Sequence, residues 1–155
     1  MPVRCQATPD LLSWTPPDLV ERFDDRTVRA ASLRDRIAHG VAQTLRDAAA
    51  RGQERDAIAA AMTTWLGEEV SLHMLNAYAS EAKSEHTINF LRVLALVHVT
   101  GDVRLLQMAA EMFGRAVVEE RHLPWIEVGL LSEKREELDR VYEATRRAAR
   151  RGGRS

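Results

Sequence analysis

A set of polar residues between positions 71 and 83 has the types and spacing that suit reading DNA. From His73 onward its members lie three or four residues apart, so that a helix would place them on one face. Hydroxyl, imidazole and amide groups form hydrogen bonds with base edges, and Asn pairs well with adenine. The alternative is the ordinary polar surface of any exposed helix. The set consists of Ser71, His73, Asn76, Ser80 and Lys83.

Basic residues elsewhere can supply phosphate contacts. Arg55 precedes the polar set at the start of an earlier helix, where a guanidinium can touch the DNA backbone. A second group lies in the C-terminal sequence TRRAARRGGRS, and such a basic tail holds phosphates without sequence preference. The alternative for this tail is a frayed, solvated terminus. Its arginines are Arg146, Arg147, Arg150, Arg151 and Arg154.

The sequence predicts no catalytic residue, no metal site and no cofactor. Cys5 is the only cysteine, so neither an internal disulfide nor a cysteine-based zinc site can form. The five histidines do not occur in a His-Glu-x-x-His arrangement, and no nucleophile elbow, phosphate loop or dinucleotide fingerprint is present. We therefore expect a protein that is not an enzyme.

The polar set needs a helix pair to position it, and residues 54–80 predict one. A helix from Glu54 to Leu66 ends at Gly67, and Ser71 then caps a second helix that reaches Ser80. This order is that of a helix-turn-helix, whose second helix enters the major groove. The two helices are further apart in the sequence than in the usual helix-turn-helix motif, which requires an additional turn on the first helix or a longer connection.

The remaining signals predict an all-α chain with five helices in residues 32–114. Ser32 and Asp35 suit the start of a helix that continues to about Arg51 and places Leu33 on its apolar stripe. A fourth helix begins after Ser84 or Thr87, and a fifth carries the apolar residues between 103 and 112. This element order resembles a compact lambda-repressor-like domain.

Two segments flank this domain. Residues 1–31 predict a tail and an apolar strap, in which Thr15 caps a short helix bearing Leu19 and Phe23. The strap either covers the domain or docks on another protein. Residues 115–155 predict a long helix from about Trp125 to Arg150 with a weak heptad pattern, which favours pairing into a homodimer.

Composition and charge bound the class of protein. The chain has 155 residues, 45% of them hydrophobic, which is enough for one ordinary domain with a packed core. No signal peptide and no apolar run of the roughly 20 residues that a membrane helix needs is present, so we expect a cytoplasmic protein without membrane contact. Residues 54–114 contain four basic and eight acidic residues, a net charge of −4, which counts against DNA binding.

Several motifs together resemble small early-region proteins of Mu-like transposable phages and prophages. The resemblance runs from Leu11 to about Leu131 and implies a DNA-binding transcriptional regulator in a bacterial host cell, with its reading residues between Ser71 and Ser80. The motifs are Leu-Leu-Ser-Trp-x-Pro-Pro at 11–17, Leu-Gly-Glu-Glu-Val-Ser at 66–71, Met-Leu-Asn-Ala-Tyr-Ala-Ser-Glu at 74–81, Ser-Glu-His at 84–86 and Val-Thr-Gly-Asp at 99–102.

Two hypotheses follow from these observations. The first is a sequence-specific regulator, dimeric, that binds double-stranded DNA through the helix from Ser71 to Ser80. The second is a non-enzymatic adaptor that uses the same helical fold to bind a transposition protein or a host protein. The acidic charge of residues 54–114 and the amphipathic C-terminal helix motivate the second hypothesis.

Overall fold

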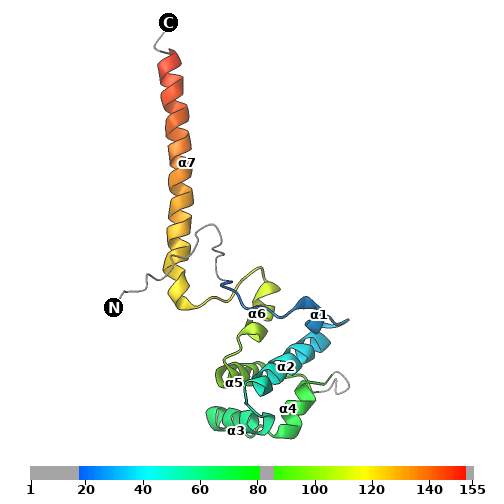
Figure 1. Ribbon diagram of the computed structural model, residues 1–155. Helices are drawn as coiled ribbons and strands as arrows, with labels where there is room; N and C mark the ends of the chain where they lie inside the picture. Colours follow the sequence, from blue (N-terminus) through cyan, green and yellow to red (C-terminus); the bar gives the residue numbers. More distant parts are fainter. Residues whose placement is uncertain (1–17, 81–85, 153–155) are drawn as a thin grey trace, which may run out of the picture. The chain divides into compact units, whose positions relative to one another are not determined.

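The computed structural model describes residues 18–80 and 86–152 (Figure 1). All regular secondary structure in these residues is helical, and they contain no strand. The prediction of an all-α chain is thus confirmed for these residues. Five α-helices lie within residues 32–114, and one further α-helix lies on each side of this range, which makes seven in the described residues. The helices are α1 (Asp25–Val28), α2 (Leu33–Ala50), α3 (Arg55–Leu66), α4 (Leu72–Tyr78), α5 (Phe90–Thr100), α6 (Arg104–Glu111) and α7 (Leu123–Gly152), with a 3-10 turn at Glu120–His122 before α7.

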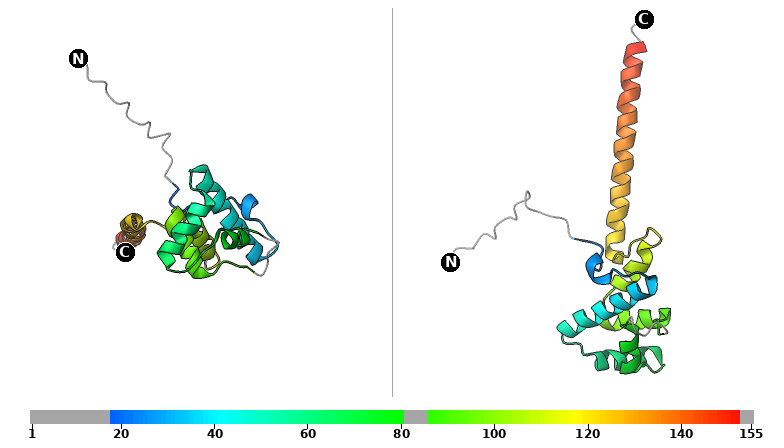
Figure 2. Two further views of the ribbon diagram at one scale, coloured as in Figure 1. Left: turned by 90° about the horizontal axis from the view of Figure 1, so that it is seen from below. Right: turned by 90° about the vertical axis from the view of Figure 1, so that its right-hand side faces the viewer.

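The chain divides into two compact units, residues 1–117 and residues 118–155. In the first unit, helices α2 to α6 gather into one bundle, as the further views of Figure 2 also show. The second unit consists of the 3-10 turn and α7, which is a single unbroken helix. No helix in the described ranges combines the length and the apolar character needed to cross a membrane.

Helix α2 begins and ends where its local sequence predicts. The Ser32 hydroxyl oxygen accepts a hydrogen bond from the Asp35 backbone N–H at 3.1 Å and donates one to the Asp35 carboxylate at 2.7 Å. Both contacts satisfy groups that the first turn of a helix leaves open. Leu33, the first residue of the predicted apolar stripe, is 47% exposed and is not part of the buried core. It lies in the first turn of α2 and lines an open apolar pocket together with residues of α5 and α6.

The predicted helix of the N-terminal strap is wrong in position. Leu19 and Val20 are not helical, and α1 begins at Asp25 instead. The carboxylate of Asp24 accepts a hydrogen bond from the Arg26 backbone N–H at 2.9 Å, which makes Asp24 the cap. Phe23 is buried in the core as the strap hypothesis requires, while Thr15 lies outside the described residues.

The start of the fourth predicted helix also needs correction. Asn89, not Thr87, caps α5, because its side-chain oxygen accepts a hydrogen bond from the Arg92 backbone N–H at 2.9 Å. Ile88 is buried just before this cap and therefore fixes where the chain enters the helix. Ser84, the other predicted cap, lies outside the described residues.

The ends of the last two helices differ from prediction by a few residues. Helix α6 ends at Glu111, which leaves Met112 exposed beyond it rather than in the core. Helix α7 begins at Leu123, two residues before the predicted start at Trp125, because Pro124 is tolerated in the first turn of a helix.

The core of the first unit is built from apolar side chains of α2 to α6 and is completed by the strap and by the loops before α4 and α5. The side chains in it are almost wholly hidden from solvent, so they account for most of the hydrophobic stabilisation of the unit. Its members include Phe23, Val28, Val41, Leu45, Ile58, Met62, Val70, Leu75, Tyr78, Ile88, Leu96, Leu105 and Met108.

A buried ion cluster joins α2 to the start of α6. Asp102 is only 5% exposed and accepts hydrogen bonds from the Arg104 guanidinium (Nη2 at 2.6 Å) and the Thr44 hydroxyl (2.8 Å). Arg104 Nη2 also lies 2.5 Å from the carboxylate of Asp47, and its guanidinium packs 4.5 Å from the centre of the Phe23 ring. Burial alone would raise the pKa of Asp102, but the hydrogen bonds from Arg104 and Thr44 outweigh it and lower that pKa.

Candidate nucleic-acid interface

The connection between α3 and α4 is held by one glycine and one hydroxyl group. Gly67 closes α3 in the left-handed region (φ 69°), where glycine has no steric penalty, and its N–H donates to the Thr63 carbonyl at 2.9 Å. The Thr63 hydroxyl accepts the Val70 backbone N–H at 2.9 Å, and the Val70 side chain is buried. The turn is therefore fixed at both ends.

Helix α4 has a buried side and an exposed side. Ser71 caps it as predicted, since its hydroxyl oxygen accepts the Met74 backbone N–H at 3.2 Å. Leu75 and Tyr78 anchor the helix in the core, whereas His73 and Asn76 are exposed. The exposed residues are those that the helical spacing assigned to the outer face.

One member of the predicted set, Ser80, lies beyond the end of α4. The helix ends at Tyr78, so Ser80 follows it, is only half-buried, and donates its backbone N–H to the Ala77 carbonyl at 3.2 Å. Its predicted place on the face of the helix is therefore wrong. Lys83 lies outside the described residues.

Arg55 and Asn76 are brought together by the fold. Arg55 Nη1, at the start of α3, donates a hydrogen bond to Asn76 Oδ1 at 2.6 Å, across the turn between the two helices. A guanidinium can only donate, so this contact determines which end of the Asn76 amide faces Arg55. The amide NH₂ group then points away from Arg55. Asn76 is thus held in one orientation on an exposed face.

The charge around this pair is acidic rather than basic. Glu68 and Glu69 are exposed in the turn before α4, and Glu54 and Asp56 flank Arg55 at the start of α3. This face therefore attracts phosphates weakly on its own. Binding of DNA here would have to draw its phosphate contacts from other parts of the chain.

Four of the predicted phosphate-contacting arginines are on α7. Arg146, Arg147, Arg150 and Arg151 are all exposed in its last turns, and Arg154 lies outside the described residues. Arg146 Nη1 lies 3.4 Å from the carboxylate of Glu143, a weak pair within the helix. Near a helix C-terminus, where the macrodipole is negative, such cations are favoured.

The chain was compared with protein-family models, curated proteins and solved structures. None of them matches. Among the residues that the structure describes, no group of three or more His, Cys, Asp or Glu side chains is placed to hold a metal ion. The interpretation of the α3–α4 face thus depends on its own geometry.

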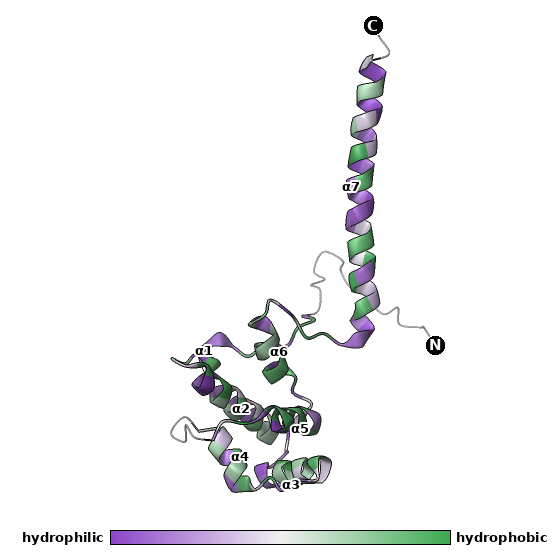
Figure 3. Ribbon diagram, turned by 180° about the vertical axis from the view of Figure 1, so that it is seen from behind, coloured by the Kyte–Doolittle hydropathy of each residue, from purple (hydrophilic) through white to green (hydrophobic). Residues whose placement is uncertain are grey.

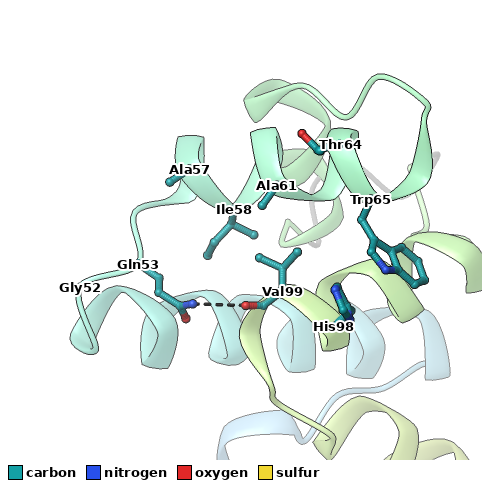
Figure 4. A pocket seen from close by; sticks show the side chains of 9 residues that line it. All are labelled: Gly52, Gln53, Ala57, Ile58, Ala61, Thr64, Trp65, His98 and Val99. Atoms are coloured by element: carbon teal, nitrogen blue, oxygen red, sulfur yellow. Dashed lines mark hydrogen bonds between the residues drawn. The ribbon is translucent and has the colours of Figure 1, made fainter.

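Sequence reasoning missed a groove beside α3. Trp65 on α3 is 48% exposed and stacks on His98 of α5, with ring centres 5.0 Å apart (Figure 4). These rings close one end of a groove of about 1000 Å³ whose far end is formed by Gly52 and Gln53. Gln53 Nε2 donates a hydrogen bond to the Val99 carbonyl at 3.3 Å, which joins the two walls. No sequence signal pointed to the stack, because the two aromatic residues lie on different helices.

Arg92 was also missed as a support for α4. Its guanidinium carbon lies 5.6 Å from the centre of the Tyr78 ring, and the guanidinium donates a hydrogen bond to the Tyr78 hydroxyl. Tyr78 is the last residue of α4, so the contact ties the end of that helix to α5. Arg92 therefore stabilises the position of α4 from its buried side, opposite the exposed side that bears His73 and Asn76.

Proposed function

We propose that the chain is a non-enzymatic, sequence-specific DNA-binding transcriptional regulator of a Mu-like phage or prophage, acting in the cytoplasm of the bacterial host. Helix α4 would lie in the major groove with His73 and Asn76 toward the bases. The hydrogen bond from Arg55 to Asn76 is the observation that carries this proposal. It prepares an amide on an exposed helix for the paired donor and acceptor contact that Asn makes with adenine.

The fixed turn supports the same interpretation. A recognition helix must keep its angle to the helix before it, and Gly67 together with Thr63 provides that restraint. Leu75 anchors the helix from the inner side, so that residues on its outer side can be substituted without disturbing the core. The domain would thus belong to the helix-turn-helix class.

Because the surface around Asn76 is acidic, base contact and phosphate contact would be made by different residues. Asn76 would select the base sequence, while the exposed arginines at the end of α7 would supply most of the phosphate neutralisation. Sequence preference and salt dependence would then be separable by mutation.

The test begins with selection of bound sequences from random DNA by the full-length protein. Fluorescence anisotropy then compares the selected site with a scrambled one across a salt series. Asn76→Ala should weaken binding to the selected site about tenfold to a hundredfold, and leave the scrambled site unchanged. Arg55→Ala should have a similar effect, whereas Arg46→Ala, which removes one exposed guanidinium on α2, is the control and should not.

A second arm replaces the α7 arginines at 146, 147, 150 and 151 with glutamine. Affinity should fall equally for the selected and the scrambled site. The slope of log K against log salt concentration should decrease in magnitude by about 0.9 for each phosphate that the variant no longer neutralises. Equal affinity of the unmodified protein for selected and scrambled DNA, or no binding at low salt, would overturn the proposal.

The groove beside α3 supports a second candidate, an adaptor that binds a transposition protein or a host protein. A half-exposed Trp65 stacked on His98 offers the aromatic surface that protein interfaces favour. Titration of purified phage transposition proteins against the full-length chain, followed by Trp65→Ala, tests this candidate. Retained DNA selectivity in a Trp65→Ala variant that no longer binds a protein partner would show that both activities exist on separate surfaces.

A further inference from the structure

Helix α7 exposes an apolar stripe that nothing within its own unit covers. None of its residues is buried, and its four leucines are 47% to 70% exposed. Figure 3 shows apolar and polar residues alternating along the whole helix. A stripe of this kind is expected to pack against another helix. The leucines are Leu123, Leu130, Leu131 and Leu138.

Ion pairs along the surface of α7 support its helical conformation without a partner. Several ion pairs link residues three or four positions apart, including Lys134–Glu137 at 2.5 Å and Glu136–Arg140 at 3.6 Å. Pairs of this type stabilise an isolated helix. The exposed leucines therefore call for an explanation other than helix formation.

The stripe has a symmetry that selects its partner. Leu130 and Leu131 are adjacent, and Leu123 and Leu138 lie seven residues outside them on either side. All four leucines are thus arranged symmetrically about the midpoint between Leu130 and Leu131. A second copy of the helix, running in the opposite direction and centred on this point, would place leucine against leucine throughout.

Two charged residues lie within the same stripe and obey the same symmetry. At about 100° per residue, Glu127 and Lys134 fall between the leucines on the helix surface. Each lies three residues outside the central pair, Glu127 before Leu130 and Lys134 after Leu131. Antiparallel pairing therefore places Glu127 of one copy against Lys134 of the other, twice.

Parallel pairing in register has the opposite electrostatic result. It would bring Glu127 against Glu127 of the second copy and Lys134 against Lys134, both inside an apolar seam. Like charges at facing positions are destabilising, and their burial without a partner is worse. In the antiparallel arrangement Lys134 exchanges its exposed partner Glu137 for Glu127 of the second copy, with little loss because an exposed pair contributes little.

We infer that residues 123–138 of α7 form an antiparallel two-helix coiled coil with the same segment of a second copy, held by the four leucines and two Glu127–Lys134 ion pairs. The paired segment spans about 24 Å. The arginines at 146, 147, 150 and 151 lie beyond it and remain open to solvent. This pairing is independent of whether α4 binds DNA.

Disulfide crosslinking of the full-length chain tests the direction of pairing. In a Cys5→Ser background, the Glu127→Cys and Lys134→Cys variants are each oxidised alone and as a mixture after subunit exchange. Antiparallel pairing predicts crosslinked dimers only in the mixture, because a disulfide requires Cβ atoms about 4 Å apart. In each single variant the two thiols are separated by about 10 Å along the helix axis. Crosslinking of either variant with itself would show parallel pairing and overturn the inference.

Charge exchange tests the ion pairs through the dimer dissociation constant, measured by sedimentation equilibrium. Glu127→Lys and Lys134→Glu should each raise Kd about tenfold, because both symmetry-related contacts become repulsive. The double exchange should restore Kd to within about threefold of the unmodified protein. Glu133→Lys, the same charge change outside the stripe, is the control and should leave Kd unchanged. A protein that is monomeric at about 100 μM, or a double exchange as weak as the single ones, would overturn the inference.

Discussion

Replacement of Asp102 by asparagine should destabilise the first unit, because it breaks the ion cluster that joins α2 to the start of α6. The carboxylate is 5% exposed and accepts hydrogen bonds from Arg104 Nε at 2.8 Å, Arg104 Nη2 at 2.6 Å and Thr44 at 2.8 Å. Removing one partner of a buried ion pair costs about 3–5 kcal/mol. Because Arg104 keeps Asp47 at 2.5 Å, we expect a smaller loss of about 2–3 kcal/mol in the free energy of unfolding, below that range.

The assay is urea unfolding followed by tryptophan fluorescence. With Trp14 and Trp125 replaced by phenylalanine, Trp65 is the only tryptophan and reports on the packing of α3 and α5. An m-value of about 1.5 kcal/mol/M places the expected shift of the midpoint near 1.5 M urea. Asp18→Asn, an exposed carboxylate of the same unit, is the control and should shift the midpoint little.

The pH dependence of this difference provides a second test. The pKa of Asp102 is lower in the folded state than its ordinary value of 3.8, so its stabilising contribution is fully present above that value. The contribution is lost as the pH falls from 3.8 through the lower folded pKa. The difference between the unmodified protein and Asp102→Asn should therefore shrink below about pH 4. A difference below about 0.5 kcal/mol at pH 7, or one that does not shrink in acid, would refute this account of the cluster.

Two further predictions concern the elements that position the candidate face. Thr63→Val keeps the shape of the side chain but removes the acceptor for the Val70 N–H, so urea unfolding should show a loss of about 1–2 kcal/mol and DNA selectivity should weaken with it. Thr63→Ser, which keeps the hydroxyl, is the matched control. Asn89→Ala removes the cap of α5 and should cost about 1 kcal/mol, whereas Thr87→Ala should be nearly neutral; equal losses for the two variants would contradict the assignment of Asn89 as the cap.

The parts of the fold that the sequence predicted correctly are those with strong local signals. Ser32 and Ser71 each cap a helix at the predicted residue, and Gly67 ends α3 in a conformation that glycine alone adopts easily. Each signal depends on hydrogen bonds within one turn of the chain, so no knowledge of the tertiary structure is needed.

The errors arose where tertiary packing chose between local alternatives. Thr87 and Asn89 are both acceptable caps, and the burial of Ile88 between them settles the start of α5. Arg104 and Asp102 are close in sequence, but the link from Asp102 to Thr44 joins residues 58 positions apart. Nothing in the local sequence predicts such a contact.

The candidate site shows the same division. Helical spacing identified His73 and Asn76 as outward-facing residues of α4. It did not predict that Arg55, 21 positions earlier, would donate a hydrogen bond to Asn76. Spacing assigns a residue to a face, while only the fold determines which residues of two faces meet.

The residues to which we assign stability, proposed base contact and proposed pairing are different residues, so each proposal can be tested by itself. Asp102 is buried and distant in sequence from α4, so its replacement should lower the free energy of unfolding without changing which DNA sequence is preferred. Asn76 is exposed, so Asn76→Ala should change selectivity at nearly constant stability. Glu127 lies in the other unit, so its replacement should change only the dimer dissociation constant and whatever depends on dimer concentration.

A loss of DNA selectivity in Glu127→Lys that disappears at high protein concentration would therefore show that two copies must act together on one site. A loss that persists at every concentration would place α7 itself in the recognition of DNA.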